Sequence, residues 1–75
     1  MGRKYTLEQS RSLAELTQEE LAEKLGVSVS TYAKYEAYKT YMRMDTAYLF
    51  STITGVSMDD IIFLPIRYGK SVLGA

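Results

Sequence analysis

The sequence has no cysteine, no histidine and no tryptophan, and its single proline is Pro65. Without cysteine the chain cannot form disulfide bonds or thiolate metal sites. Without histidine it lacks the commonest metal ligand and the commonest general base of enzymes. These absences argue against an enzyme or a metalloprotein, and we expect no cofactor, no metal and no small-molecule ligand.

Long apolar runs are also absent. No stretch approaches the roughly 18 apolar residues that cross a bilayer. Arg3 and Lys4 are not followed by the apolar segment of a signal peptide. We therefore expect a soluble cytoplasmic protein with no membrane partner. The chain has 75 residues and is 47% hydrophobic, which suits one small folded domain rather than a disordered chain.

Acidic and basic residues are separated along the chain, although the formal net charge is zero. Residues 6–27 contain five glutamates but only two basic residues. Residues 28–43 contain Lys34, Lys39 and Arg43 against a single carboxylate. A local basic surface that could meet a nucleic acid is therefore compatible with a net charge of zero.

Capping signals predict an all-α fold of five short helices. Capping boxes at Thr6–Gln9 and Thr17–Glu20 open the first two helices, the second of which ends at Gly26. The three later helices are expected over 29–37, 44–54 and 58–63. Five helices joined by tight turns leave little room for a sheet.

The predicted third helix has an unusual outward face. On a helical wheel Tyr32 and Tyr35 fall together on the inner side. The opposite side carries small residues and one basic residue, namely Ser30, Ala33, Lys34 and Ala37, with Val29 at its edge. Short side chains, a hydroxyl and a cation suit a helix that lies in the major groove of DNA. From the pattern alone, the same residues are equally compatible with an ordinary solvated face.

The stretch TQEELAEKLGVSVSTYAKYE, residues 17–36, resembles the helix-turn-helix of the Cro and lambda-repressor family, also called the xenobiotic-response-element-like family. The matching residues, in register without a gap, are Arg11, Leu16, Thr17, Gln18, Leu21, Ala22, Leu25, Gly26, Val27, Ser28, Thr31, Tyr35, Glu36, Lys39, Gly55, Val56, Ser57, and Asp59 or Asp60 followed by Ile62. The ending DIIFLP, residues 60–65, is similar to that of small phage and mobile-element repressors. The resemblance implies a lambda-repressor-like domain over 6–63, with a basic arm over 1–5 and a tail over 64–75.

The resemblance also implies a function, that of a transcriptional regulator and most simply a repressor. It would read double-stranded operator DNA in the major groove with its third helix. The implied base contacts are Val29, Ser30, Ala33, Lys34. The implied contacts to the DNA backbone are Gln18, Thr31, Lys39, Tyr41, Arg43. Thr31 could instead fill the gap between two helices, and the last three residues could simply be solvated.

In the family that this chain resembles, the residues at the positions of Arg11 and Glu36 form an ion pair. The resemblance therefore implies a structural pair that ties the first helix to the third. Such a pair would orient the reading helix and keep the carboxylate of Glu36 away from DNA.

The chain departs from the family pattern where Glu15, Tyr38 and Met42 replace the usual Gly, Gly and Pro. A tyrosine in the left-handed region costs on the order of 1 kcal/mol. Two outcomes are open for Tyr38. It adopts that conformation, or the third helix continues past it and displaces Lys39 and Arg43.

One reading helix covers half an operator, so the resemblance implies a homodimer, formed in solution or only on DNA. The candidate contacts are apolar residues away from the reading helix: Leu49, Ile53, Phe63, Leu64, Ile66, Tyr68, Val72, Leu73. Alternatively, Phe63 and Leu64 close the core of the monomer. A rival function is a protein-interaction module that keeps the fold without binding DNA, which the zero net charge favours.

Overall fold

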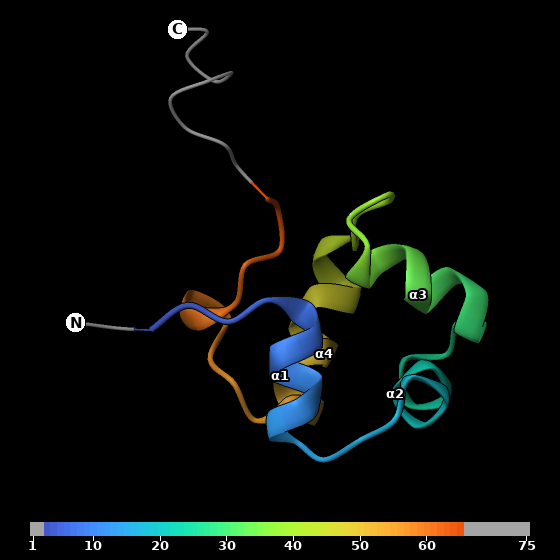
Figure 1. Ribbon diagram of the computed structural model, residues 1–75, viewed down its shortest axis with the longest axis horizontal. Coiled ribbons are helices and arrows are strands. Elements are labelled where there is room, and N and C mark those ends of the chain that lie inside the picture. Colours follow the sequence, from blue (N-terminus) through green and yellow to red (C-terminus); the bar gives the residue numbers. More distant parts are fainter. Residues whose placement is uncertain (1–2, 66–75) are drawn as a thin grey trace, which may run out of the picture.

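The computed structural model describes residues 3–65, which form four α-helices and one 3-10 turn. The elements are α1 (Leu7–Leu13), α2 (Gln18–Leu25), α3 (Val29–Glu36), α4 (Met44–Thr54) and η1 (Met58–Asp60). In Figure 1, α1 stands in front of α4, and α2 and α3 lie beside them. The predicted all-α class is confirmed. The candidate dimer contacts Ile66, Tyr68, Val72 and Leu73 lie outside the described residues.

Side chains cap the first three helices at their N-termini. The hydroxyl of Thr6 accepts from the Gln9 amide (3.1 Å), and the Gln9 side chain accepts from the Thr6 amide (2.9 Å). Thr17 and Glu20 form the same reciprocal pair at 3.0 and 2.9 Å. Ser28 caps α3 through the amide of its third residue, at 3.0 Å. Because these bonds are local, the sequence places the three helix starts correctly.

Left-handed residues follow the C-terminal ends of all four helices. The backbone angle φ is +78° at Gly26 and at Gly55, and +59° at Glu15 and at Tyr38. Glycine adopts this conformation without a steric penalty, whereas a residue with a Cβ is strained in it. Tyr38 therefore takes the first of the two outcomes described above, and α3 ends at Glu36.

The core lies where the helices meet, and two aromatic rings form its centre. Tyr32 and Phe50 are fully buried, with ring centroids 6.5 Å apart and an angle of 20° between the planes. Phe63 packs edge-on against Phe50 at 6.1 Å. Ile53 also packs against this core. Phe63 and Ile53, both candidates for a dimer contact, are thus partly covered within one chain, whereas Leu64 is 49% exposed.

The predicted fifth helix is present only as the 3-10 turn η1. Ile61 leaves this turn in an extended conformation and forms an isolated parallel bridge with Tyr5. The Tyr5 amide donates to the carbonyl of Asp60, and the Ile62 amide donates to that of Tyr5, both at 2.7 Å. Figure 1 shows the N-terminal segment passing η1 on its way to α1. β-Branched residues favour extended backbone, and the N-terminal arm supplies the pairing partner.

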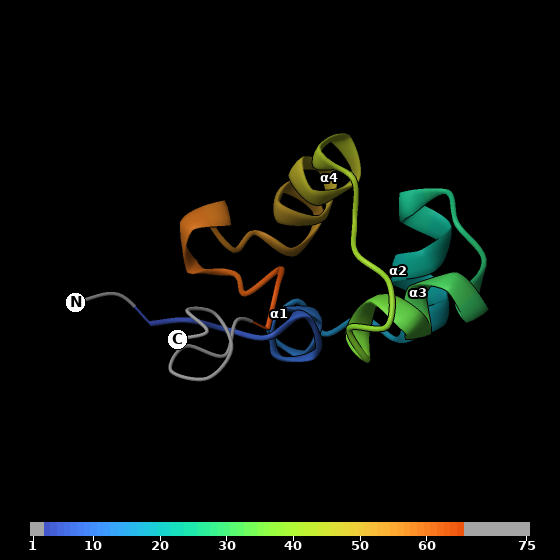
Figure 2. The ribbon, with the colours of Figure 1, turned by 90° about the horizontal axis from the view of Figure 1, so that it is seen from above.

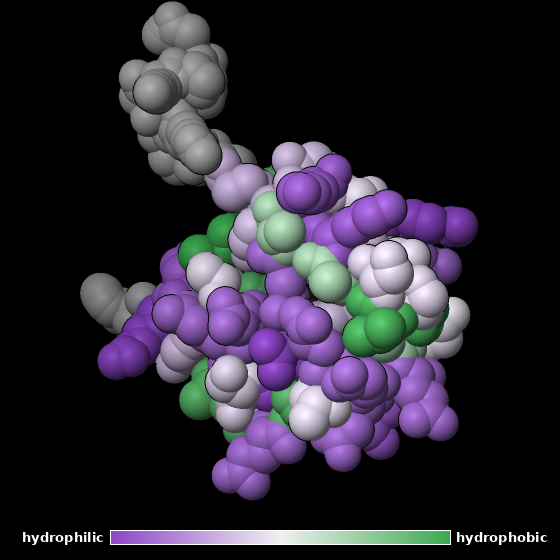
Figure 3. Space-filling model, turned by 45° about the vertical axis from the view of Figure 1, so that its right-hand side comes forward, coloured by the Kyte–Doolittle hydropathy of each residue, from purple (hydrophilic) through white to green (hydrophobic). Residues whose placement is uncertain are grey.

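Several apolar side chains of the described part remain exposed. Met44 is 77% exposed and Tyr48 is 68% exposed. Helical spacing places Met44 on the same side of α4 as Ala47, yet Met44 is exposed and the buried positions of this helix begin at Ala47. On the face drawn in Figure 3, hydrophobic residues form small separate areas within a mostly hydrophilic surface. No helix in the described part is long and apolar enough to span a membrane.

Candidate nucleic-acid interface

Helices α2 and α3 form a compact pair joined by the short turn of residues 26–28. Figure 2 shows the two helices crossing at one end of the domain, away from the N-terminus. The inner side of α2 buries Leu21 and Leu25, and the inner side of α3 buries Tyr32 and Tyr35. Burial of these faces leaves the opposite side of α3 at the surface.

The outward side of α3 is small and carries one charge. Val29 is 42% exposed, and Ser30 and Lys34 are exposed along the same side. Thr31 and Ala33 are half-buried. Every residue that the sequence assigns to base contacts thus reaches the surface, and together they form a short strip along α3.

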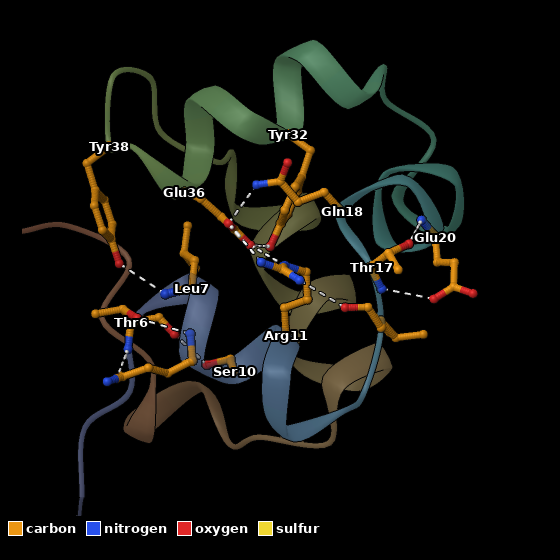
Figure 4. A network of polar contacts seen from close by, with 12 residues as sticks. Thr6, Leu7, Ser10, Arg11, Thr17, Gln18, Glu20, Tyr32, Glu36 and Tyr38 are labelled. Carbon is orange, nitrogen blue, oxygen red and sulfur yellow. Dashed lines mark hydrogen bonds and ion pairs between the residues drawn. The ribbon is translucent and has the colours of Figure 1, made fainter.

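The only carboxylate of α3 is turned away from this strip and into an ion pair. Nε of Arg11 lies 2.5 Å from Oε2 of Glu36, and Nη2 lies 3.3 Å from Oε1. The third guanidinium nitrogen, Nη1, donates to the carbonyl of Leu16 at 3.0 Å. The two side chains are 16% and 8% exposed, respectively. This two-point contact, visible in Figure 4, joins α1 to α3.

Two further side chains donate to the same carboxylate. The Gln18 amide lies 2.8 Å from Oε1 of Glu36, and the Tyr32 hydroxyl lies 2.7 Å from Oε2. Figure 4 shows both converging on Glu36 from α2 and α3. The side chain of Gln18, expected to contact the DNA backbone, is half-buried and donates from its nitrogen to Glu36. The bond from the hydroxyl of Tyr32 was not expected from the sequence, which predicts Tyr32 only as a buried ring.

These hydrogen bonds keep Glu36 and Arg11 charged at physiological pH. Burial opposes the ionisation of Glu36, but hydrogen bonds from Arg11, Tyr32 and Gln18 outweigh it and hold the pKa of Glu36 below its usual range. The hydrogen bond to Glu36 raises the pKa of Arg11. Burial, followed by the bond to Glu36, raises the pKa of Tyr32, so its hydroxyl remains a donor.

The loop between α3 and α4 holds the three other residues assigned to the DNA backbone. Lys39 and Tyr41 are exposed. Arg43 lies 3.6 Å from Asp45, and both side chains are more than two-thirds exposed. An exposed pair of this kind is weak, so Asp45 does little to hold the side chain of Arg43 in place. Among the described residues no cluster of acidic side chains could hold a metal ion.

Tyr38 precedes this loop, and the sequence draws attention only to its backbone conformation. Its hydroxyl donates to the carbonyl of Ile62 at 2.5 Å and accepts from the amide of Leu7 at 3.2 Å. The ring is half-buried against the core. No sequence signal indicates these bonds, because the three residues are distant along the chain.

Helices α2 and α3, joined by the three-residue turn of residues 26–28, have the arrangement of a helix-turn-helix. Comparison with known families agrees, since the model of the helix-turn-helix family matches residues 7–61. The chain is a member of this family, in its Cro and lambda-repressor type.

One curated protein similar to this chain is the uncharacterized HTH-type transcriptional regulator YobD of Bacillus subtilis (strain 168). The two are 38% identical over 58 residues, which make up 77% of this chain and 52% of YobD. The chain therefore spans about half the length of this relative. No solved structure matches the chain.

Proposed function

We propose that this chain is a sequence-specific DNA-binding transcriptional regulator, most simply a phage-type repressor, that reads its operator with α3. The observation that carries the proposal is the position of Glu36. The only carboxylate of α3 is held by Arg11, Gln18 and Tyr32 within the domain. The strip that would face the major groove therefore carries hydroxyl, apolar and cationic groups without a negative charge to repel phosphates.

Each part of this surface has a separate role in the proposal. Val29, Ser30 and Lys34 contact base edges, while Ala33 contacts a thymine methyl group. The contacts to phosphates come from Thr31, Lys39, Tyr41, Arg43 and from Gln18. Because the side chain of Gln18 bonds to Glu36, its contact is made by the backbone amide at the start of α2. These contacts supply most of the affinity and no sequence information, whereas the strip on α3 supplies the specificity.

The proposal includes a homodimer on the operator. Two copies of α3 would enter successive major grooves about 34 Å apart. Leu49 and Leu64 are exposed apolar residues available for this contact in the described part. Sedimentation of the full chain with and without a palindromic site tests the dimer, and one monomer per selected site would contradict it.

Selection of bound sequences from random DNA is the direct test of the function. We expect a defined motif, bound with an affinity that falls steeply as salt increases. Lys34→Ala should then lose about 1–3 kcal/mol of discrimination at one base pair. The matched control is Lys24→Ala, which removes an exposed lysine from α2 and should leave the motif unchanged.

A second candidate is a protein-interaction module without DNA binding. The exposed side chains of Met44 and Tyr48 on α4 favour it, as does the net charge of zero. Failure to enrich any DNA sequence, together with no binding to random DNA at low salt, would replace the first proposal with this one.

A further inference from the structure

We infer that Tyr38 is a positioning residue for the loop of residues 39–43, which the proposed function assigns to DNA phosphates. The inference rests on that function and extends it to a side chain that faces away from DNA. It accounts for a tyrosine at a position where the backbone conformation favours glycine.

The backbone at Tyr38 reverses the chain at the end of α3. Its amide donates to the carbonyl of Tyr35 at 3.0 Å, and the next amide, that of Lys39, donates to the carbonyl of Lys34 at 2.9 Å. Together with φ of +59° at Tyr38, these bonds form the arrangement in which helices commonly end on glycine. The direction in which Lys39 leaves α3 therefore depends on Tyr38 staying in this conformation.

The hydroxyl of Tyr38 connects this turn to two distant segments. It accepts from the amide of Leu7, which is the first residue of α1 and has no acceptor within its own helix. It also donates to the carbonyl of Ile62, next to the bridge that joins both ends of the domain. Figure 4 shows the ring reaching from the end of α3 to α1.

These contacts explain why the strained conformation persists. A non-glycine residue stays in the left-handed region only where its surroundings hold it there. The half-buried ring of Tyr38 and its two hydrogen bonds supply that restraint. Glycine would relieve the strain but could not tie the turn to α1 and to Ile62.

The ring and the hydrogen bonds of Tyr38 hold one end of the loop of residues 39–43, and α4 holds the other end. Lys39 follows Tyr38 directly, and Arg43 is the N-cap residue of α4. Five residues thus run between two held points, which limits the conformations available to Lys39, Tyr41 and Arg43. A loop held in this way loses less conformational entropy when its side chains bind phosphates.

The test compares Tyr38→Phe with the matched control Tyr48→Phe, which removes a hydroxyl from an exposed side chain. Binding to the selected site and to random DNA is measured across a range of salt concentrations. In Tyr38→Phe we expect the slope of log affinity against log salt to become shallower by about one for each phosphate that the loop no longer neutralises. The preferred bases should stay the same. The control should keep both the slope and the bases.

A purely structural role for Tyr38 predicts a different result. In that case Tyr38→Phe melts at a lower temperature. At temperatures where it is folded, it binds with the same slope of log affinity against log salt as the unchanged chain. This outcome overturns the inference. Lys39→Ala supplies an additional readout. It should make the slope shallower in the unchanged chain and have little further effect in the Tyr38→Phe background.

Tyr38→Gly is a second variant that can be measured if Tyr38→Phe does not fold, because glycine suits the left-handed turn. It should show the same shallow slope. If Tyr38→Gly binds like the unchanged chain, the side chain does not position the loop and the inference is wrong. If the unchanged chain itself binds no DNA, the proposed function fails, which is a distinct result.

Discussion

Replacing Glu36 by alanine should strongly destabilise the domain, because three donors then face an empty site. The guanidinium of Arg11, the amide of Gln18 and the hydroxyl of Tyr32 lie 2.5, 2.8 and 2.7 Å from its carboxylate oxygens. Arg11 is only 16% exposed. Its charge would lose its counter-charge while remaining mostly shielded from water.

The size of the loss follows from the burial of the pair. Removing one partner from a buried ion pair costs about 3–5 kcal/mol. Arg11 keeps its bond to the carbonyl of Leu16, so we expect about 3 kcal/mol. A domain of 75 residues has a free energy of unfolding of roughly 4–11 kcal/mol. Glu36→Ala should therefore lower the melting temperature by roughly 12–24 °C.

A double-mutant cycle separates pairing from general damage. Arg11→Met and Glu36→Ala together should cost about 1–3 kcal/mol less than the sum of the single changes. Urea unfolding followed by circular dichroism measures each value. The exposed pair Arg43 and Asp45 is the matched control, and its coupling should stay within about 0–1 kcal/mol. Additive losses at Arg11 and Glu36 would refute the reasoning.

Three further predictions concern the same framework. Because the pKa of Glu36 lies below the ordinary value of 4.5, its stabilising effect is present above that pH and is lost in more acidic solution. Urea titrations at several pH values should show a flatter profile for Glu36→Gln, and parallel profiles would contradict this. Tyr32→Phe should cost about 1 kcal/mol in thermal melts without changing the bases selected; an altered motif would mean that Tyr32 also orients α3. Thr17→Ala removes the cap of α2 and should cost about 0.5–2 kcal/mol, whereas an unchanged melting temperature would show that the capping box is energetically unimportant.

Local chemistry explains which parts of the fold were predictable. Thr6, Thr17 and Ser28 bond to amides a few residues away, so their helix starts are visible in the sequence. The expected fifth helix does not form because Ile61 pairs with Tyr5, a residue near the other end of the sequence. Capping patterns contain no information about such distant pairings.

The candidate site, too, has features that the sequence predicts and features that it does not. The face of α3 follows from helical periodicity, and the Arg11–Glu36 pair was expected only from the resemblance to a family. The convergence of Gln18 and Tyr32 on Glu36 depends on how three helices pack, which no local pattern indicates. The hydroxyl contacts of Tyr38 were missed for the same reason.

The bridge between Tyr5 and Ile61 has a consequence for engineering. It brings the two ends of the described domain side by side, and adjacent ends are the condition under which circular permutation succeeds. A short linker could join the segment after Ile62 to the one before Tyr5, with the chain opened between Thr40 and Tyr41. The four α-helices of the described part would stay intact, but the loop of residues 39–43 would be held at one end only on each side of the cut. The permuted chain should therefore fold and keep its base preference while it loses the phosphate contacts of that loop.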